Sequence, residues 1–152
     1  MGYRSDVAIS IYKKDFDELC RQISEKGINS NHWSLLTYAD IDIDGDEDNP
    51  ESIVTMIWSD VKWYDGFDDV DFIMHFIRSG DRKYAYKRIG EDCDDCEQES
   101  NDDNWELSQV VYIDRSFGRD SYGRSVKAEK FLDGAQGESI DAGMKFDDVI
   151  GG

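Results

Sequence analysis

The stretch that decides the fold is Ser52–Trp63, which reads SIVTMIWSDVKW. At the two-residue period of a strand, apolar side chains occupy both of its faces. These are Ile53, Thr55, Ile57 and Val61 on one face and Val54, Met56 and Trp58 on the other. Because a strand that is apolar on both faces must be covered on both, this segment predicts a strand in the middle of a sheet.

Working outward, alternation predicts further strands at residues 7–12, 37–43, 83–89 and 105–114. Apolar residues at helical spacing predict helices at residues 15–26 and 65–78. Asp15 is expected to cap the first helix and Gly27 to end it. The segment from Trp33 is open to two interpretations, since Trp33, Leu35 and Leu36 could begin a helix. The alternation up to Ile43 favours a strand.

The predicted order is therefore β-α-β-β-α-β-β. It indicates an α+β fold in which two helices lie on one face of a single, mostly antiparallel sheet, a ferredoxin-like variant. We expect this domain to cover residues 1–115. After Phe117, glycines recur and apolar residues thin out, so residues 116–152 are predicted to be a flexible or loosely docked tail.

The negative charge is concentrated in one part of the chain. The net charge is −18, and residues 40–106 hold twenty-two acidic and six basic side chains against five of each in residues 1–39. Such a surface suggests a cationic partner and disfavours direct binding of nucleic acid or of an anionic membrane. The sequence has no apolar run of the ~20 residues that a membrane span needs. Residues 1–6 do not resemble the start of a signal peptide, and the number of cysteines is odd, three, so no signal peptide and a cytoplasmic location are expected.

One acidic segment matches a metal-binding pattern. Asp40–Glu51 fits D-x-D-x-D-G-x5-E, the calcium loop of an EF-hand, and its ligands would be Asp40, Asp42, Asp44, Asp46 and Glu51. Glu47 and Pro50 occupy positions that such loops fill differently, and the flanks resemble strands, so a solvated acidic turn is the favoured interpretation. The Cys93–Cys96 pair has metal-ligand spacing but no second pair, which favours incidental surface cysteines. No other cofactor and no catalytic motif stands out, so a non-enzymatic role is expected.

Two acidic segments, Asp40–Glu51 and Glu91–Glu106, would form one patch if their turns emerged at the same edge of the sheet. Carboxylates spaced like phosphates could then occupy a groove built for DNA, giving a DNA-mimic-like surface. The alternative is that the acids only keep the protein soluble. The predicted partner-binding residues are Asp40, Asp42, Asp44, Asp46, Glu47, Asp48, Asp94, Asp95, Glu97, Glu99, Asp102 and Asp103.

Three short segments carry a resemblance: Gly2–Val7 (GYRSDV), Lys62–Asp65 (KWYD) and Arg88–Asp92 (RIGED). They resemble segments of a group of small bacteriophage and prophage proteins, and the similarity covers roughly residues 2–115. The resemblance implies a phage setting, in the cytoplasm of an infected host cell. The sequence thus predicts an acidic interaction protein that inhibits a host nucleic-acid-binding or defence protein with a basic surface. The alternative is a calcium-binding module.

Overall fold

The computed structural model describes residues 3–92, 94–101, 107, 111–113, 117–119 and 124–132, which form an α+β fold. In chain order the elements are β1 (Ser5–Tyr12), α1 (Lys13–Lys26), α2 (Asn31–Tyr38), β2 (Asp40–Asp44), β3 (Ile53–Val61), α3 (Asp68–Arg78), β4 (Tyr84–Ile89), β5 (Cys96–Ser100), β6 (Val111–Ile113), β7 (Phe117–Arg119), β8 (Arg124–Lys127) and the 3-10 helix η1 (Ala128–Phe131). None of the described helices is long and apolar enough to cross a membrane.

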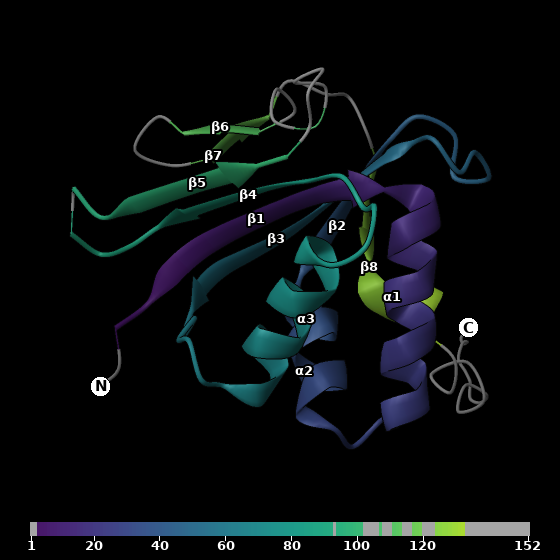
Figure 1. Ribbon diagram of the computed structural model, residues 1–152, viewed down its shortest axis with the longest axis horizontal. Helices are drawn as coiled ribbons and strands as arrows, with labels where there is room; N and C mark the ends of the chain where they lie inside the picture. Colours follow the sequence, from purple (N-terminus) through teal and green to yellow (C-terminus); the bar gives the residue numbers. More distant parts are fainter. Residues whose placement is uncertain are drawn as a thin grey trace, which may run out of the picture.

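Six strands make the main sheet, in the order β5-β4-β1-β3-β2-β8, with every neighbouring pair antiparallel (Figure 1). Strand β3 lies between β1 and β2, so the central position expected for Ser52–Trp63 is confirmed. Strand β1 is also internal, between β3 and β4. The described β6 and β7 pair with each other in a separate two-stranded sheet.

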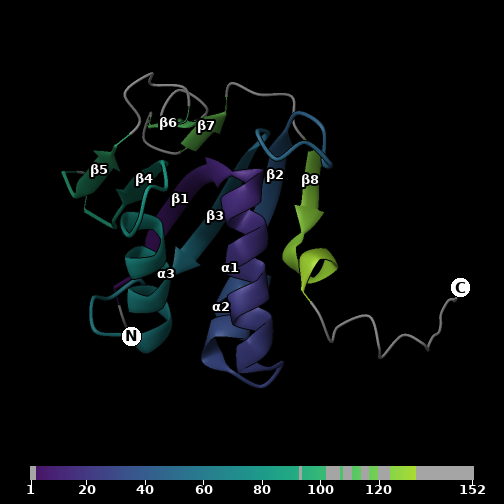
Figure 2. The same ribbon diagram turned by 45° about the vertical axis from the view of Figure 1, so that its right-hand side comes forward.

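The three helices pack against one face of the main sheet, and both views show them on the same side (Figures 1 and 2). The core on this side joins apolar side chains of all three helices to Val7, Ile9 and Ile11 of β1 and Val54, Met56 and Trp58 of β3. The other face carries a smaller apolar cluster of Ala8, Ile53, Ile57, Ala85 and Leu107. Both faces of β3 are thus covered, as its double-sided apolar pattern requires.

Helix α2 is the first departure from the sequence-based expectation of two helices. Residues 33–38 are helical rather than extended, and only Asp40–Asp44 form the strand. The hydroxyl of Ser30 accepts a hydrogen bond from the backbone N–H of Trp33 at 3.1 Å, which caps the helix. In the helix, Trp33, Leu35 and Leu36 are all buried in the same core. In a strand, the adjacent residues Leu35 and Leu36 would point to opposite faces.

Strand β5 is the second departure, because Cys96–Ser100 falls in the segment expected to be an acidic loop. The expected last strand, residues 105–114, is not the one beside β4, and of it only Val111–Ile113 is described as a strand. The high content of acidic residues in this segment favoured a loop. The strand forms because β4 supplies partners for its carboxylates.

Strand β8 and η1 come from the segment expected to be a tail. Strand β8 pairs with β2, and η1 places the ring of Phe131 5.2 Å from that of Phe16 in α1. Leu132 is buried in the main core. The boundary at residue 115 stays a prediction, but described packing continues to Leu132.

Candidate interaction surface

The described parts of the two acidic segments do not meet. Asp40–Asp44 lies in β2 and Glu97 and Glu99 lie in β5, with β3, β1 and β4 between them. That separation is four strand spacings, roughly 19 Å. The segments also turn at opposite ends of the sheet, since Tyr12 of β1 pairs with Ile53 whereas Asp6 pairs with Ile89. Figure 1 shows the β4–β5 turn at the far left and the β2–β3 turn at the upper right. The condition for a single acidic patch, that both turns emerge at the same edge of the sheet, is therefore not met.

The first segment does not form the loop that a calcium site requires. Asp40, Asp42 and Asp44 follow one another along an extended strand, and Asp42 is buried with 5% of its surface exposed. In an extended strand the outer two are about 13 Å apart, whereas an EF-hand loop wraps its ligands around one ion. Within the part of the chain that the structure describes, no group of three or more His, Cys, Asp or Glu side chains is arranged to hold a metal.

The turn after β2 instead supports the start of α1. The carbonyl oxygens of Ser52 and Pro50 accept hydrogen bonds from the N–H groups of Lys13 and Lys14, at 2.8 and 3.1 Å. These N–H groups would otherwise lack intrahelical partners. Tyr12, not Asp15, is the N-cap residue, and it makes no side-chain capping bond. Backbone carbonyls of the turn, and not the Asp15 carboxylate, accept the hydrogen bonds at the start of α1, so the prediction that Asp15 caps this helix was wrong. Gly27 ends the helix as expected.

The remaining residues of this segment are mostly on the surface. Asp46 and Asp48 are exposed and Glu47 is half-buried. Glu51 forms an ion pair with Lys14 at 3.5 Å. This corner therefore presents exposed carboxylates around a turn that is fastened to α1.

In the second segment, the two glutamates of β5 are paired with cations of the same chain. Glu99 forms a two-bond ion pair with Arg78 of α3, with both N···O distances 2.8 Å, and accepts a hydrogen bond from the hydroxyl of Tyr84. Glu97 accepts hydrogen bonds from Tyr86 at 3.0 Å and from Arg88 at 3.1 Å. Each glutamate of β5 thus lies between one tyrosine and one arginine.

These contacts set the charge states along β5. Hydrogen bonds from Arg78 hold the pKa of Glu99 below its ordinary value, and those from Arg88 do the same for the pKa of Glu97. Burial raises the pKa of Tyr86 and of Tyr84, and the adjacent glutamates add to the rise. At neutral pH the strand therefore presents ionised carboxylates beside neutral phenols.

The turn between β4 and β5 is held by residues 3–5, near the start of the chain. Asp95 accepts hydrogen bonds from the hydroxyl of Tyr3 at 2.6 Å and from Arg88 at 2.6 Å, and Arg88 also donates to the hydroxyl of Ser5 at 2.9 Å. Hydrogen bonds from Arg88, and then from Tyr3, lower the pKa of Asp95. The backbone N–H of Arg4 donates to Glu91 at 2.6 Å. Residues 3–5 and 88–92, which lie in two of the segments that carry the resemblance, are therefore in contact here.

A cavity of about 650 Å³ lies between α3 and β5, and we call it the α3–β5 groove. Its lining residues are Trp63, Asp65, Asp71, Met74, Arg78, Tyr86, Cys96, Glu97, Gln98 and Glu99. Four carboxylates thus face one guanidinium, with Arg88 close by. Trp63 and Asp65 belong to the KWYD segment, Lys62–Asp65, which also carries the resemblance.

Sequence reasoning identified only part of this groove. Glu97 and Glu99 were predicted to bind a partner, whereas Asp65 and Asp71 were not among the predicted binding residues. The Asp71 carboxylate accepts a hydrogen bond from the N–H of Gly66 at 3.1 Å, in the turn before α3, whereas the N-cap residue Phe67 makes no side-chain capping bond. The signal that joins these acids to β5 is tertiary, because α3 crosses the sheet beside that strand. Asp94 is exposed. Asp102, Asp103 and Cys93 lie outside the described residues.

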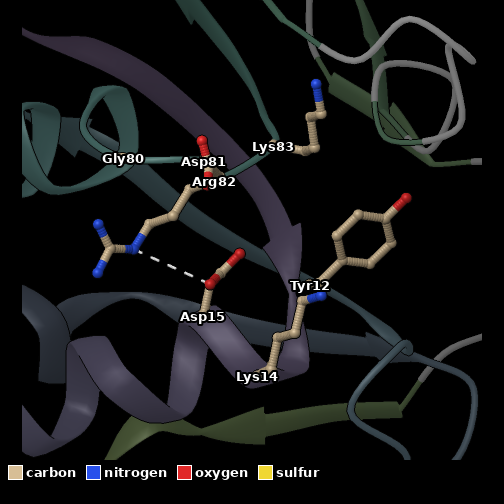
Figure 3. Close-up of a pocket in the computed structure, with 7 residues that line it drawn as sticks. All are labelled: Tyr12, Lys14, Asp15, Gly80, Asp81, Arg82 and Lys83. Atoms are coloured by element: carbon tan, nitrogen blue, oxygen red, sulfur yellow. Dashed lines mark ion pairs between the residues drawn. The ribbon is translucent and has the colours of Figure 1, made fainter.

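A second cavity, of about 400 Å³, lies at the opposite end of β1 and is lined by Tyr12, Lys14, Asp15, Gly80, Asp81, Arg82 and Lys83. Its cations do not converge. Arg82 lies 3.9 Å from Asp15 and stacks on the ring of Phe76, while Lys83 points away from both (Figure 3). Burial raises the pKa of Asp15, and Arg82 offsets part of that rise. The contact between Arg82 and Asp15 therefore links the α3–β4 connection to α1.

Of these two cavities, the α3–β5 groove is the one in which carboxylates outnumber cations, since the second is lined by two aspartates and three cations. Compared with protein-family models, with curated proteins and with solved structures, this chain finds no match.

Proposed function

We propose that this chain is an acidic interaction protein that binds a protein with a basic surface, and that the α3–β5 groove is where it does so. The observation that carries the proposal is the lining of this one hollow by four carboxylates and one guanidinium. The partner-binding surface predicted from the sequence required both acidic segments in one patch. The surface proposed here requires only the α3–β5 groove.

The lining chemistry suits a cationic side chain. Asp65 and Asp71 are exposed, while Trp63 and Tyr86 supply aromatic surface. An ammonium or guanidinium group gains from both, through ion pairing and through the electron-rich face of an aromatic ring. A carboxylate-lined groove repels phosphate, so a nucleic acid is a poor ligand for it.

The biological setting is part of the proposal. The resemblance of the GYRSDV, KWYD and RIGED segments to phage and prophage proteins supports a role inside an infected host cell. There the proposed action is inhibition of a host nucleic-acid-binding or defence protein, whose phosphate-binding surface is basic. A ferredoxin-like arrangement, extended by α2, β5 and β8, is supported by the strand order β4-β1-β3-β2. Such a fold implies no activity by itself.

The test is capture of host proteins on the immobilised chain, followed by mass spectrometry. The groove variant is Asp65→Asn with Asp71→Asn, which keeps the oxygen that accepts from Gly66. The matched control is Asp46→Asn with Asp48→Asn, which removes the same charge at the opposite corner.

We expect a partner that binds wild type and the control, and that is lost from the groove variant. It should also be lost near 1 M salt, where the screening length falls to roughly 3 Å. A partner retained equally by both variants would refute the assignment of the groove.

A further inference from the structure

Strand β5 is an edge of the main sheet, and among the described strands only β4 pairs with it. In an antiparallel pair, backbone groups point alternately toward and away from the neighbour. The N–H of Gly90 donates to the carbonyl of Asp95, and that of Asn101 donates to the carbonyl of Tyr84. Asp95 and Asn101 therefore direct their backbone groups toward β4, and so do Glu97 and Glu99 at the same two-residue period. Cys96 and Gln98, which lie between them, direct their N–H and C=O groups away from β4.

The same alternation separates the side chains. Glu97 and Glu99 lie opposite Arg88 and Tyr86 on the helix side of the sheet, facing the α3–β5 groove. A strand added beside β5 would place every second side chain on that side. Those side chains would meet Glu97, Glu99 and the two aspartates of the groove.

Charge selects the occupant of this edge. A second copy of β5 pairing with the first would bring glutamates together across the two strands, and like charges in that position are destabilising. An extended segment with lysine or arginine at alternate positions would instead place each cation beside a carboxylate.

We propose that the basic partner adds an extended segment to the outer edge of β5, with alternate basic side chains entering the α3–β5 groove. This inference rests on the proposed function and specifies how it is carried out. Main-chain hydrogen bonds to Cys96 and Gln98 hold the segment, and the groove selects its charge pattern.

The first test uses synthetic peptides and fluorescence anisotropy. One short peptide alternates lysine with threonine, and its control has the same composition with the lysines in one block. We expect the alternating peptide to bind at least about tenfold more tightly, a difference that a single well-formed contact accounts for.

Two further peptides are N-methylated, one at every lysine and one at every threonine. Only one set of N–H groups faces β5, so one methylated series should lose binding and the other keep it. If both series bind equally well, or both equally poorly, strand addition is refuted.

The second test changes the protein. Gln98→Pro removes an N–H that points away from β4, and proline is tolerated at such edge positions. Gln98→Thr keeps the N–H. We expect the proline variant alone to lose the alternating peptide, with unchanged thermal unfolding and with amide signals of β4 unmoved in ¹⁵N spectra.

The outcomes separate this inference from the proposed function. Equal binding of alternating and block peptides, sensitive to Asp65→Asn with Asp71→Asn, overturns strand addition and leaves the acidic groove in place. No binding of any basic peptide, together with no salt-sensitive partner in the capture experiment, overturns both.

Discussion

Gly90 lies in the turn between β4 and β5, where the side chains of Asp95 and Tyr3 come close to the backbone. A Cβ atom at this position would collide with the Asp95 carboxylate and the Tyr3 hydroxyl. We expect Gly90→Ala to lower the free energy of unfolding by about 1–3 kcal/mol, the usual cost of overpacking. Thermal unfolding measures this loss.

A double-mutant cycle identifies its cause. Asp95→Ala removes the carboxylate that the new methyl group would meet, so Gly90→Ala should cost clearly less in that background. Purely additive losses would mean that the glycine is needed for another reason.

The Arg78–Glu99 pair predicts a pH dependence. Because Arg78 lowers the pKa of Glu99 in the folded state, this pair stabilises the fold above pH 4.5, the ordinary pKa of glutamate, and the stabilisation is lost as the pH falls through the lower folded pKa. We expect Arg78→Gln to lower stability at neutral pH and to flatten the decline in acid. Denaturant unfolding over a pH series measures both effects, and Lys62→Gln, which removes an exposed cation elsewhere, should leave the slope unchanged.

At the scale of elements, α2 depends on its cap. Ser30→Ala removes the hydroxyl that accepts from Trp33 and should cost about 1 kcal/mol. Ser34 is exposed in the middle of the same helix. Ser34→Ala should therefore be neutral or slightly stabilising, since alanine is the better helix former. Equal losses in denaturant unfolding for the two variants would contradict the capping role.

The elements that sequence reasoning identified correctly are those whose burial pattern is local. Strands β1, β3 and β4 and helices α1 and α3 carry their apolar period within their own residues. Helix α2 was missed because eight residues contain too few turns for a period, and the deciding signal is one serine. Strand β5 was missed because its glutamates are compensated by Arg78 and Arg88, which are distant in the sequence from CEQES.

At the scale of the whole molecule, β8 and η1 predict where the chain can be shortened. Phe131 packs on Phe16, and Lys13 lies over the same ring at 5.6 Å. A chain ending at residue 132 keeps these contacts and should unfold at the temperature of the full chain. A chain ending at residue 123 uncovers the edge of β2 and should unfold at a lower temperature. Circular dichroism during heating compares the two, and identical curves would show that β8 contributes nothing.

Charge counting alone does not show where the acidic residues lie in the fold. Their distribution over two corners follows from strand order, which composition does not encode. The pairing of Glu97 and Glu99 with arginines depends on the same order. Two of the acids that line the α3–β5 groove, Asp65 and Asp71, belong to neither of the two acidic segments.

Trp63 lines the α3–β5 groove and lies with its ring centroid 5.0 Å from that of the fully buried Trp58. A cation that settles against Trp63 therefore alters the surroundings of a fluorophore already coupled to a second one inside the core. The protein carries its own optical reporter: occupancy should shift and quench indole emission, and a titration can be followed without attaching a dye.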